Sequence, residues 1–185
     1  MLKALFAAGL ERYHLRKPGW DREKIQRWLA AAPATWRASI VLHGHPDLAA
    51  DFGLLGAHWR DPEAPLSPPA GPEASRACHS PQALRLSLGR YRSVLYGPAF
   101  ASISKPGHAP SAETGLAEVT QILSARSAQE RSTAVYAVGG VSLETLPLCL
   151  RMGFDGAAVL GAVWQAEDPL DAFRHLTEAT LHHAA

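Results

Sequence analysis

The stretches Ala137-Val138-Gly139-Gly140-Val141 and Gly156-Ala157-Ala158-Val159-Leu160-Gly161 carry the clearest fold signal in this chain. Each joins a short apolar strand to glycine, and the apolar residues run on without alternating with polar ones. Continuous apolar strands are typical of parallel sheets, in which both faces are buried. The two stretches therefore predict a parallel α/β fold.

The glycines at these strand ends predict an anion site. Ser142 is expected to cap the helix that follows Gly139 and Gly140, so that backbone N–H groups face the space above the sheet. In eight-stranded α/β barrels, the loops after the last two strands form the usual phosphate site. We therefore expect Gly139, Gly140, Leu160 and Gly161 to contact a phosphate. The alternative is that the glycines only allow close packing in a strand-to-helix turn.

Strands and helices alternate along the chain, as crossover connections between parallel strands require. The expected strands are residues 12–17, 39–43, 54–59, 76–79, 93–97, 134–138 and 156–160. The expected helices are residues 2–10, 21–32, 46–52, 81–88, 113–125, 142–152 and 168–182. The proline-rich residues 61–73 predict a loop.

The predicted fold is a TIM-type (β/α)8 parallel barrel without its first strand, in one domain over residues 1–185. The chain opens on the helix that should follow that strand. An uncovered barrel gap would expose unpaired N–H and C=O groups. Either the true start lies upstream of Met1, which we favour, or another segment covers the gap.

Composition indicates an ordinary cytoplasmic enzyme domain. A net charge of +1, from 18 basic and 17 acidic residues, gives no sign of nucleic-acid binding. The apolar residues 1–10 are too few to span a membrane, and Glu11 and Arg12 follow at once. Cys78 and Cys149 lack metal-binding spacing, so we expect reduced packing residues.

Functional side chains of such barrels gather at the carboxyl ends of the strands. Alternation sends His14 and Arg16 to the same side, where Arg16 is a candidate to hold a carboxylate or phosphate, or else forms a surface salt bridge. His43 and His45 share a spacing also found in metal-dependent hydrolases. The last strands end without an Asp or His that could be a further metal ligand. We therefore expect no metal and assign His43 to a polar pocket wall.

Later strand ends supply further candidates. His79 ends a short strand, and its ordinary pKa suits a group that gives and takes a proton, although a histidine that bonds a loop is the alternative. Ser102, Ser104 and Lys105 lie in a loop equipped to wrap a phosphate ester. A solvated lysine in that loop is the other interpretation.

Six collinear motifs resemble the thiamine phosphate synthase/TenI family. They are His-Leu-Arg-Lys-Pro at 14–18, Val-Leu-His-Gly-His-Pro-Asp-Leu-Ala at 41–49, Cys-His-Ser at 78–80, Gly-Pro-Ala-Phe with Ser-Ile-Ser-Lys at 97–105, Ala-Val-Gly-Gly-Val at 137–141 and Gly-Ala-Ala-Val-Leu-Gly-Ala-Val-Trp at 156–164. The resemblance covers nearly the whole chain except the absent first strand. It implies a barrel that binds a thiazole phosphate.

The resemblance also assigns individual residues. Ser102, Ser104 and Lys105 match a segment that contacts phosphate groups. Gly140 matches the phosphate-binding glycine, and Arg16 matches an arginine of the early strand.

Other positions depart from the synthase pattern. His14 stands for a glutamine, Pro18 for a lysine, and His43-Gly44 for the Asn-Asp pair that helps hold magnesium and pyrophosphate. The second magnesium carboxylate would fall near residues 61–63. Losing the aspartate at Gly44 removes a hard oxygen ligand, so we expect no cofactor, with Mg²⁺ required only if the chain is a synthase.

The tautomerase branch of the family is the nearer likeness, because it shares the glycine at Gly44 and the pair His79-Ser80. Such an enzyme moves a proton on a thiazole carboxylate phosphate without metal. His79 would carry the proton and Arg16 would pair with the carboxylate. A Mg²⁺-dependent thiamine phosphate synthase and a non-catalytic barrel that binds a thiamine precursor are the alternatives. Expected partners are a thiazole phosphate or thiamine phosphate, with no nucleic acid or membrane, and a homo-oligomer is left open.

Overall fold

The computed structural model describes residues 1–69, 72–101 and 115–184, with side chains up to Leu181. The strands are β1 (Tyr13–Leu15), β2 (Ile40–His43), β3 (Gly56–Trp59), β4 (Glu73–Cys78), β5 (Ser93–Tyr96), β6 (Ala134–Val138) and β7 (Gly156–Ala158). The α-helices are α1 (Leu2–Ala7), α2 (Arg22–Ala31), α3 (Ala34–Arg37), α4 (Pro46–Asp51), α5 (Pro81–Ser87), α6 (Leu116–Ser124), α7 (Leu146–Arg151), α8 (Gly161–Trp164) and α9 (Pro169–Ala184). Two 3₁₀ turns are η1 (Asp61–Glu63) and η3 (Glu130–Ser132).

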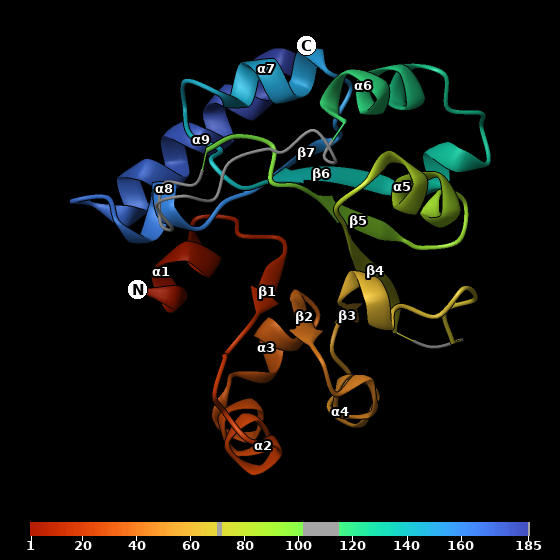
Figure 1. Cartoon of the computed structure of the whole chain (residues 1–185). Coiled ribbons are helices and arrows are strands. Elements are labelled where there is room, and N and C mark those ends of the chain that lie inside the picture. The colour runs from red at the N-terminus through yellow and green to blue at the C-terminus, as the bar shows by residue number, and fades with distance from the viewer. Residues whose placement is uncertain (70–71, 102–114, 185) are drawn as a thin grey trace.

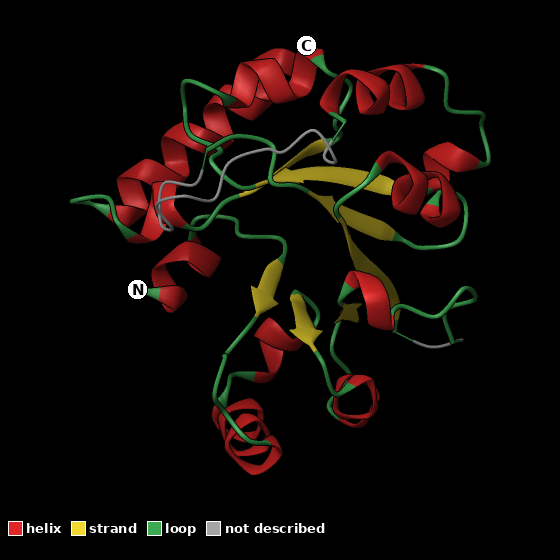
Figure 2. Cartoon of the chain, viewed as in Figure 1, coloured by secondary structure: helices red, strands yellow, loops and turns green. Residues whose placement is uncertain are grey.

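The strands form one sheet in the order of the chain, β1-β2-β3-β4-β5-β6-β7, and all six neighbouring pairs are parallel. The sheet curls into an open half-barrel with helices on its outer side (Figure 1; Figure 2). This is a TIM-type barrel lacking one strand in the described part of the chain, as the sequence predicted.

Strand alternation separates a helix-facing side from a concave side. Leu15 and Leu42 pack with Leu29 of α2 in one buried cluster, so they face the helices. Because successive side chains of a strand point to opposite faces, His14 and His43 face the concave side. Hydrogen-bond register places His43 opposite His58 of β3.

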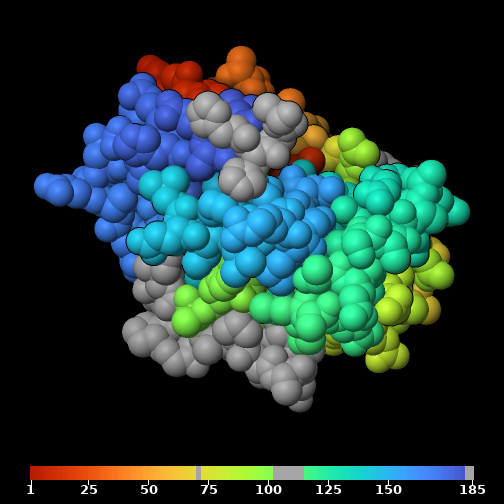
Figure 3. All heavy atoms as spheres, turned by 90° about the horizontal axis from the view of Figure 1, so that it is seen from above, coloured from red at the N-terminus to blue at the C-terminus, as the bar shows by residue number. Residues whose placement is uncertain are grey.

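Two hydrophobic clusters divide the molecule. We call β1–β3 with α2–α4 the N-terminal unit, and β4–β7 with α5–α9 the C-terminal unit. The smaller cluster lies in the N-terminal unit and the larger one in the C-terminal unit, and Trp59 packs against both. Leu5 of α1 belongs to the larger cluster, so the first helix packs on the C-terminal unit. Seen from above, the C-terminal segments and α6 adjoin on one surface, with the first residues at its border (Figure 3).

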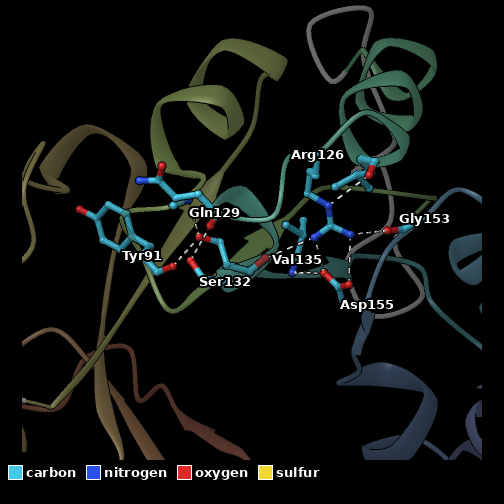
Figure 4. A network of polar contacts seen from close by, with 10 residues as sticks. Tyr91, Arg126, Gln129, Ser132, Val135, Gly153 and Asp155 are labelled. Atoms are coloured by element: carbon cyan, nitrogen blue, oxygen red, sulfur yellow. Dashed lines mark hydrogen bonds and ion pairs between the residues drawn. The ribbon is translucent and has the colours of Figure 1, made fainter.

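A buried guanidinium joins the amino-terminal ends of the last two strands. Arg126, with a side chain 3% exposed, donates to both carboxylate oxygens of Asp155 at 2.7 and 3.1 Å. It also donates to the carbonyls of Thr133 and Gly153. Asp155 in turn accepts the N–H of Val135 at 2.8 Å (Figure 4). These contacts fix β6 against β7 at the end of the barrel that serves stability rather than function.

Several boundaries differ from the expectation. β4 begins at Glu73, three residues before the predicted strand, and the short helices α3 and α8 were not predicted. α7 begins at Leu146, because residues 143–145 form a turn that Ser142 opens by accepting the N–H of Glu144. Ser142 therefore caps a turn and not the helix itself.

Two other expectations concern thiols and membranes. Cys78 and Cys149 are buried and free, as predicted. Across residues 1–69, 72–101 and 115–184, no helix combines the length and apolar character needed to cross a membrane.

Candidate functional site

Three histidines meet on the concave face of the N-terminal unit. Nδ1 of His14, on β1, lies 3.0 Å from Nε2 of His43, on β2, and the two ring centroids are 5.2 Å apart. His58 of β3 lies with its ring centroid 4.1 Å from that of His43 and 5.4 Å from that of His14. Its Nδ1 lies 2.9 Å from the hydroxyl of Ser75, on β4. The parallel register of three strands thus stacks three imidazoles in one place.

Burial keeps these imidazoles uncharged near neutral pH. It lowers the pKa of His14 to about 3, with the charge of His43 acting in the same direction. Burial and then the charge of Arg16 lower the pKa of His43 to about 4. For His58, burial and then the neighbouring histidines and Arg16 lower the pKa to about 2. Each ring therefore carries one N–H and one lone pair at pH 7.

Arg16 follows β1 directly and is exposed. Its charge contributes to lowering the pKa of His43 and of His58. No salt bridge of Arg16 occurs with any residue that the structure describes. The alternative of a surface ion pair is thus not realised within these residues, and Arg16 remains a candidate for an anionic group.

His79 follows β4 and is exposed at the same edge of the sheet. Its Nδ1 lies 2.6 Å from the carbonyl oxygen of Gly97, which comes directly after β5. Because a carbonyl only accepts, Nδ1 carries the hydrogen and donates it. The lone pair of the neutral ring then lies on Nε2, the nitrogen that a general base uses.

The glycine turn after β6 packs closely on the segment that follows β5. Gly139 and Gly140 have φ of +91° and +65°. A Cβ on Gly140 would lie 2.2 Å from the carbonyl oxygen of Ala101, and one on Gly139 would lie 3.0 Å from Pro98. Close packing alone therefore requires both glycines. Among the described residues, the N–H groups of Gly139, Gly140 and Val141 have no acceptor, so the turn also offers donors.

Other predicted phosphate-binding positions follow the neighbouring strand β7 or lie outside the described residues. Leu160 is 60% exposed after β7, and Gly161 begins α8. Ser102, Ser104 and Lys105 lie outside the described residues. The structure thus brings His14 and His43 together, sets Arg16 near them, and leaves the Ser/Lys contribution a prediction.

The carboxylates near residues 61–63 are engaged in ion pairs. Asp61 pairs with the buried Arg76 of β4, and Glu63 pairs with Arg60. Gly44, directly after β2, has no side-chain ligand atom. Mg²⁺ prefers oxygen ligands, and the donors gathered at this edge are imidazole nitrogens. The described residues therefore do not fit a magnesium site.

Sequence reasoning missed His58. The strand that contains it was predicted over residues 54–59, but its register against β2 was not visible. The available signal was alternation, which places His58 on the same face of the strand as Gly56. The absent Cβ of Gly56 lets the carbonyl of Glu73 approach closely. The pairing of His43 with His58 is a property of the sheet.

Two surface hollows lie away from these residues. One of about 350 Å³ is lined by α2 residues and Phe52, and one of about 390 Å³ lies among α1, Thr35, Trp36 and Ser39. Neither is lined by a residue at the carboxyl end of a strand, so we give them no part in the site.

Comparison with known proteins agrees with the motifs. Over 181 residues the chain is 33% identical to the thiamine-phosphate synthase of Thermus thermophilus, a match that covers 93% of this chain and 84% of that protein. The chain belongs to the thiamine phosphate synthase/TenI family. A family member from Anaeromyxobacter dehalogenans, also named thiamine-phosphate synthase, is 34% identical over 154 residues, and the match covers 80% of this chain but 65% of that protein.

A solved structure in the family supports the fold. Thiamine phosphate pyrophosphorylase from Bacteroides thetaiotaomicron superposes with a TM-score of 0.73 at 26% identity, over 96% of this chain and 88% of that one. No family model matches the sequence. The predicted resemblance is thus confirmed by relatives and by a related structure.

Proposed function

We propose that this protein is a thiamine-biosynthesis enzyme of the synthase type, which joins a hydroxymethylpyrimidine pyrophosphate to a thiazole phosphate. The observation that carries the proposal is the 33% identity over 181 residues to a relative of that name. In this reaction the thiazole nitrogen forms a bond to the pyrimidine methylene carbon as the bond to pyrophosphate breaks. The tautomerase interpretation, which the motifs favoured, has no similar support among the relatives compared.

Charge and donors at the strand ends support the binding of two phosphorylated substrates. The N–H groups of the turn Gly139–Val141, which have no acceptor among the described residues, suit the phosphate of the thiazole. Arg16 is an exposed cation directly after β1, and its forked guanidinium suits the leaving pyrophosphate. Lys105 is a further candidate from the sequence.

No step of this reaction is assigned to Mg²⁺, although the resemblance attaches that ion to a synthase. Of the two expected carboxylate positions, one is Gly44 and the other falls at Asp61, which is paired with Arg76. Calorimetry with Mg²⁺ and inorganic pyrophosphate tests this departure. We expect no joint binding in the micromolar range. Micromolar binding would show that the cation finds ligands that the described residues do not display.

A second activity, metal-independent thiazole tautomerisation, is favoured by one specific contact. The bond between His79 Nδ1 and the Gly97 carbonyl holds the ring in the tautomer whose Nε2 accepts a proton. His79 would move the proton while Arg16 pairs with the substrate carboxylate. Replacing His79 by Asn should then lower kcat of tautomerisation by ~10²-fold with KM nearly unchanged, whereas His43→Asn tests the other candidate base.

The deciding experiment measures both reactions with one preparation. We expect thiamine phosphate to form with release of pyrophosphate. Arg16→Ala should lower kcat/KM by about tenfold or more through the lost charge-assisted contact, while Arg27→Ala, a matched arginine on the exposed face of α2, should leave it unchanged. Isomerisation of the thiazole carboxylate phosphate without any coupling product would instead establish the second activity.

A further inference from the structure

The cluster of His14, His43 and His58 has the composition of a metal site. Each ring offers one nitrogen, and the three nitrogens lie within 4.8 Å of one another. The rings come from three adjacent strands, so the sheet backbone fixes their spacing. Sequence reasoning expected no metal because it lacked a further ligand, and His58 is such a ligand.

Hydrogen bonding inside the cluster is incomplete. His14 Nδ1 pairs with His43 Nε2, and His58 Nδ1 pairs with Ser75. His14 Nε2 is buried without any partner among the described residues. An unpaired buried polar atom is destabilising, and branched apolar side chains normally fill a barrel interior, so packing alone does not explain three buried imidazoles there. A cation between His14 Nδ1 and His43 Nε2 would bind the lone pairs of both nitrogens once the hydrogen they share moves to the other nitrogen of its ring.

The spacing is close to what coordination demands. Zinc binds imidazole nitrogen at about 2.0–2.1 Å, which in a tetrahedral site separates two ligand nitrogens by about 3.4 Å. His14 and His43 already meet at 3.0 Å. The third nitrogen lies within 4.8 Å of the other two, so a side-chain rotation can bring it to coordination distance. The contact of His58 with Ser75 supplies the outer hydrogen bond that orients metal-binding histidines.

Ligand type selects the ion. Three imidazoles and no carboxylate suit Zn²⁺, Co²⁺, Ni²⁺ or Cu²⁺, and disfavour Mg²⁺ and Ca²⁺. The charges of Arg12 and Arg16 act on the cluster and oppose a cation. A negatively charged oxygen ligand in the remaining coordination position would offset that repulsion.

We propose that His14, His43 and His58 form a three-histidine site for a divalent transition-metal ion of the Zn²⁺ class, with its remaining position open to an anionic oxygen ligand. The site does not depend on which reaction the protein catalyses. A measurement of metal binding is therefore sufficient to test it.

The test uses metal-stripped full-length protein titrated with Co²⁺ and with Zn²⁺. We expect one equivalent of Zn²⁺ per chain by elemental analysis after dialysis, and Co²⁺ absorption bands of the intensity that four-coordinate sites give. His43→Asn and His58→Asn should each weaken binding by more than the ~10- to 100-fold typical of losing an outer-shell contact. His175→Asn, on an exposed face of α9, is the matched control and should bind as the wild type does.

Two results would overturn the proposal. One is a wild-type protein that retains no Zn²⁺ and gives no Co²⁺ bands. The other is equal retention by the wild type and by both variants, which would place the metal at other histidines such as the pair His182-His183. If His58→Asn fails to fold by circular dichroism, His43→Asn, at a half-buried position, decides the matter together with the Zn²⁺-dependent rise in Tm of the wild type.

Discussion

The concave faces of the two units differ, because the N-terminal unit gathers imidazoles there and the C-terminal unit carries hydroxyls and apolar side chains, Ser75 and Ser93 among them. In the N-terminal unit that face carries His14, His43 and His58, all buried or half-buried. In the C-terminal unit the corresponding positions include Leu95 and Tyr136, which lie opposite each other in the register. Barrel interiors are ordinarily packed with branched apolar residues. Three clustered imidazoles depart furthest from that packing, which indicates that function and not packing selected the N-terminal half.

The largest expected effect comes from the ion pair of the buried Arg126 with Asp155 in the C-terminal unit. Asp155→Asn should lower the free energy of unfolding by about 3 kcal/mol, because it leaves the buried Arg126 guanidinium without its counter-charge. We place the value at the low end of the usual range since the Asp155 side chain is 38% exposed. Urea denaturation followed by circular dichroism measures it.

The matched control for this ion pair lies in the N-terminal unit. Asp47 pairs with Arg22 on the surface between α4 and α2, and Asp47→Asn should leave the urea midpoint unchanged. Equal losses for both variants would contradict the claim that burial makes the difference.

A smaller effect separates two glycines with the same left-handed backbone. Gly140→Ala should cost about 2 kcal/mol or more, since its Cβ would meet the Ala101 carbonyl at 2.2 Å in addition to the strained φ of +65°. Gly44→Ala, at φ +73° with nothing within 4 Å, should cost about 1 kcal/mol from backbone strain alone. Chemical denaturation of both variants under the same conditions compares them. Similar costs would mean that the turn after β6 can move away from its neighbour.

The smallest difference concerns two buried hydroxyls. Ser75→Ala should cost about 1 kcal/mol, because it leaves Nδ1 of the buried His58 unpaired. Ser87→Ala should cost less, since that hydroxyl bonds only a helix carbonyl and the Cys78 thiol. Thermal unfolding of the metal-free proteins gives the comparison. A larger loss for Ser87→Ala would show that the histidine cluster is indifferent to its outer hydrogen bond.

The order of elements was predictable because apolar strands and glycine-bearing ends repeat along the chain. The start of β4 was not predictable, because Glu73 ends a proline-rich stretch whose composition predicts a loop. In the fold its carboxylate bonds Arg12 at 2.9 Å and Arg92 at 3.4 Å, so contacts remote in sequence hold it in the sheet.

The candidate site shows the same division. His14, His43 and His79 were visible because they end strands, and the structure places all three at or beside strand ends. His58 was overlooked because only the register of β2 against β3 brings it to His43. Pairing between strands depends on the whole sheet, which no local pattern of residues encodes.

The division into two clusters joined through Trp59 has a consequence for how the native state opens. Regions with separate cores tend to unfold as separate cooperative units, and amide hydrogen exchange reports each with its own opening free energy. The smaller cluster leaves β1–β3 fewer buried contacts, so their amides should exchange before those of β5 and β6. A bound ion on the concave face would slow exchange in the first three strands selectively and leave the other rates as they are.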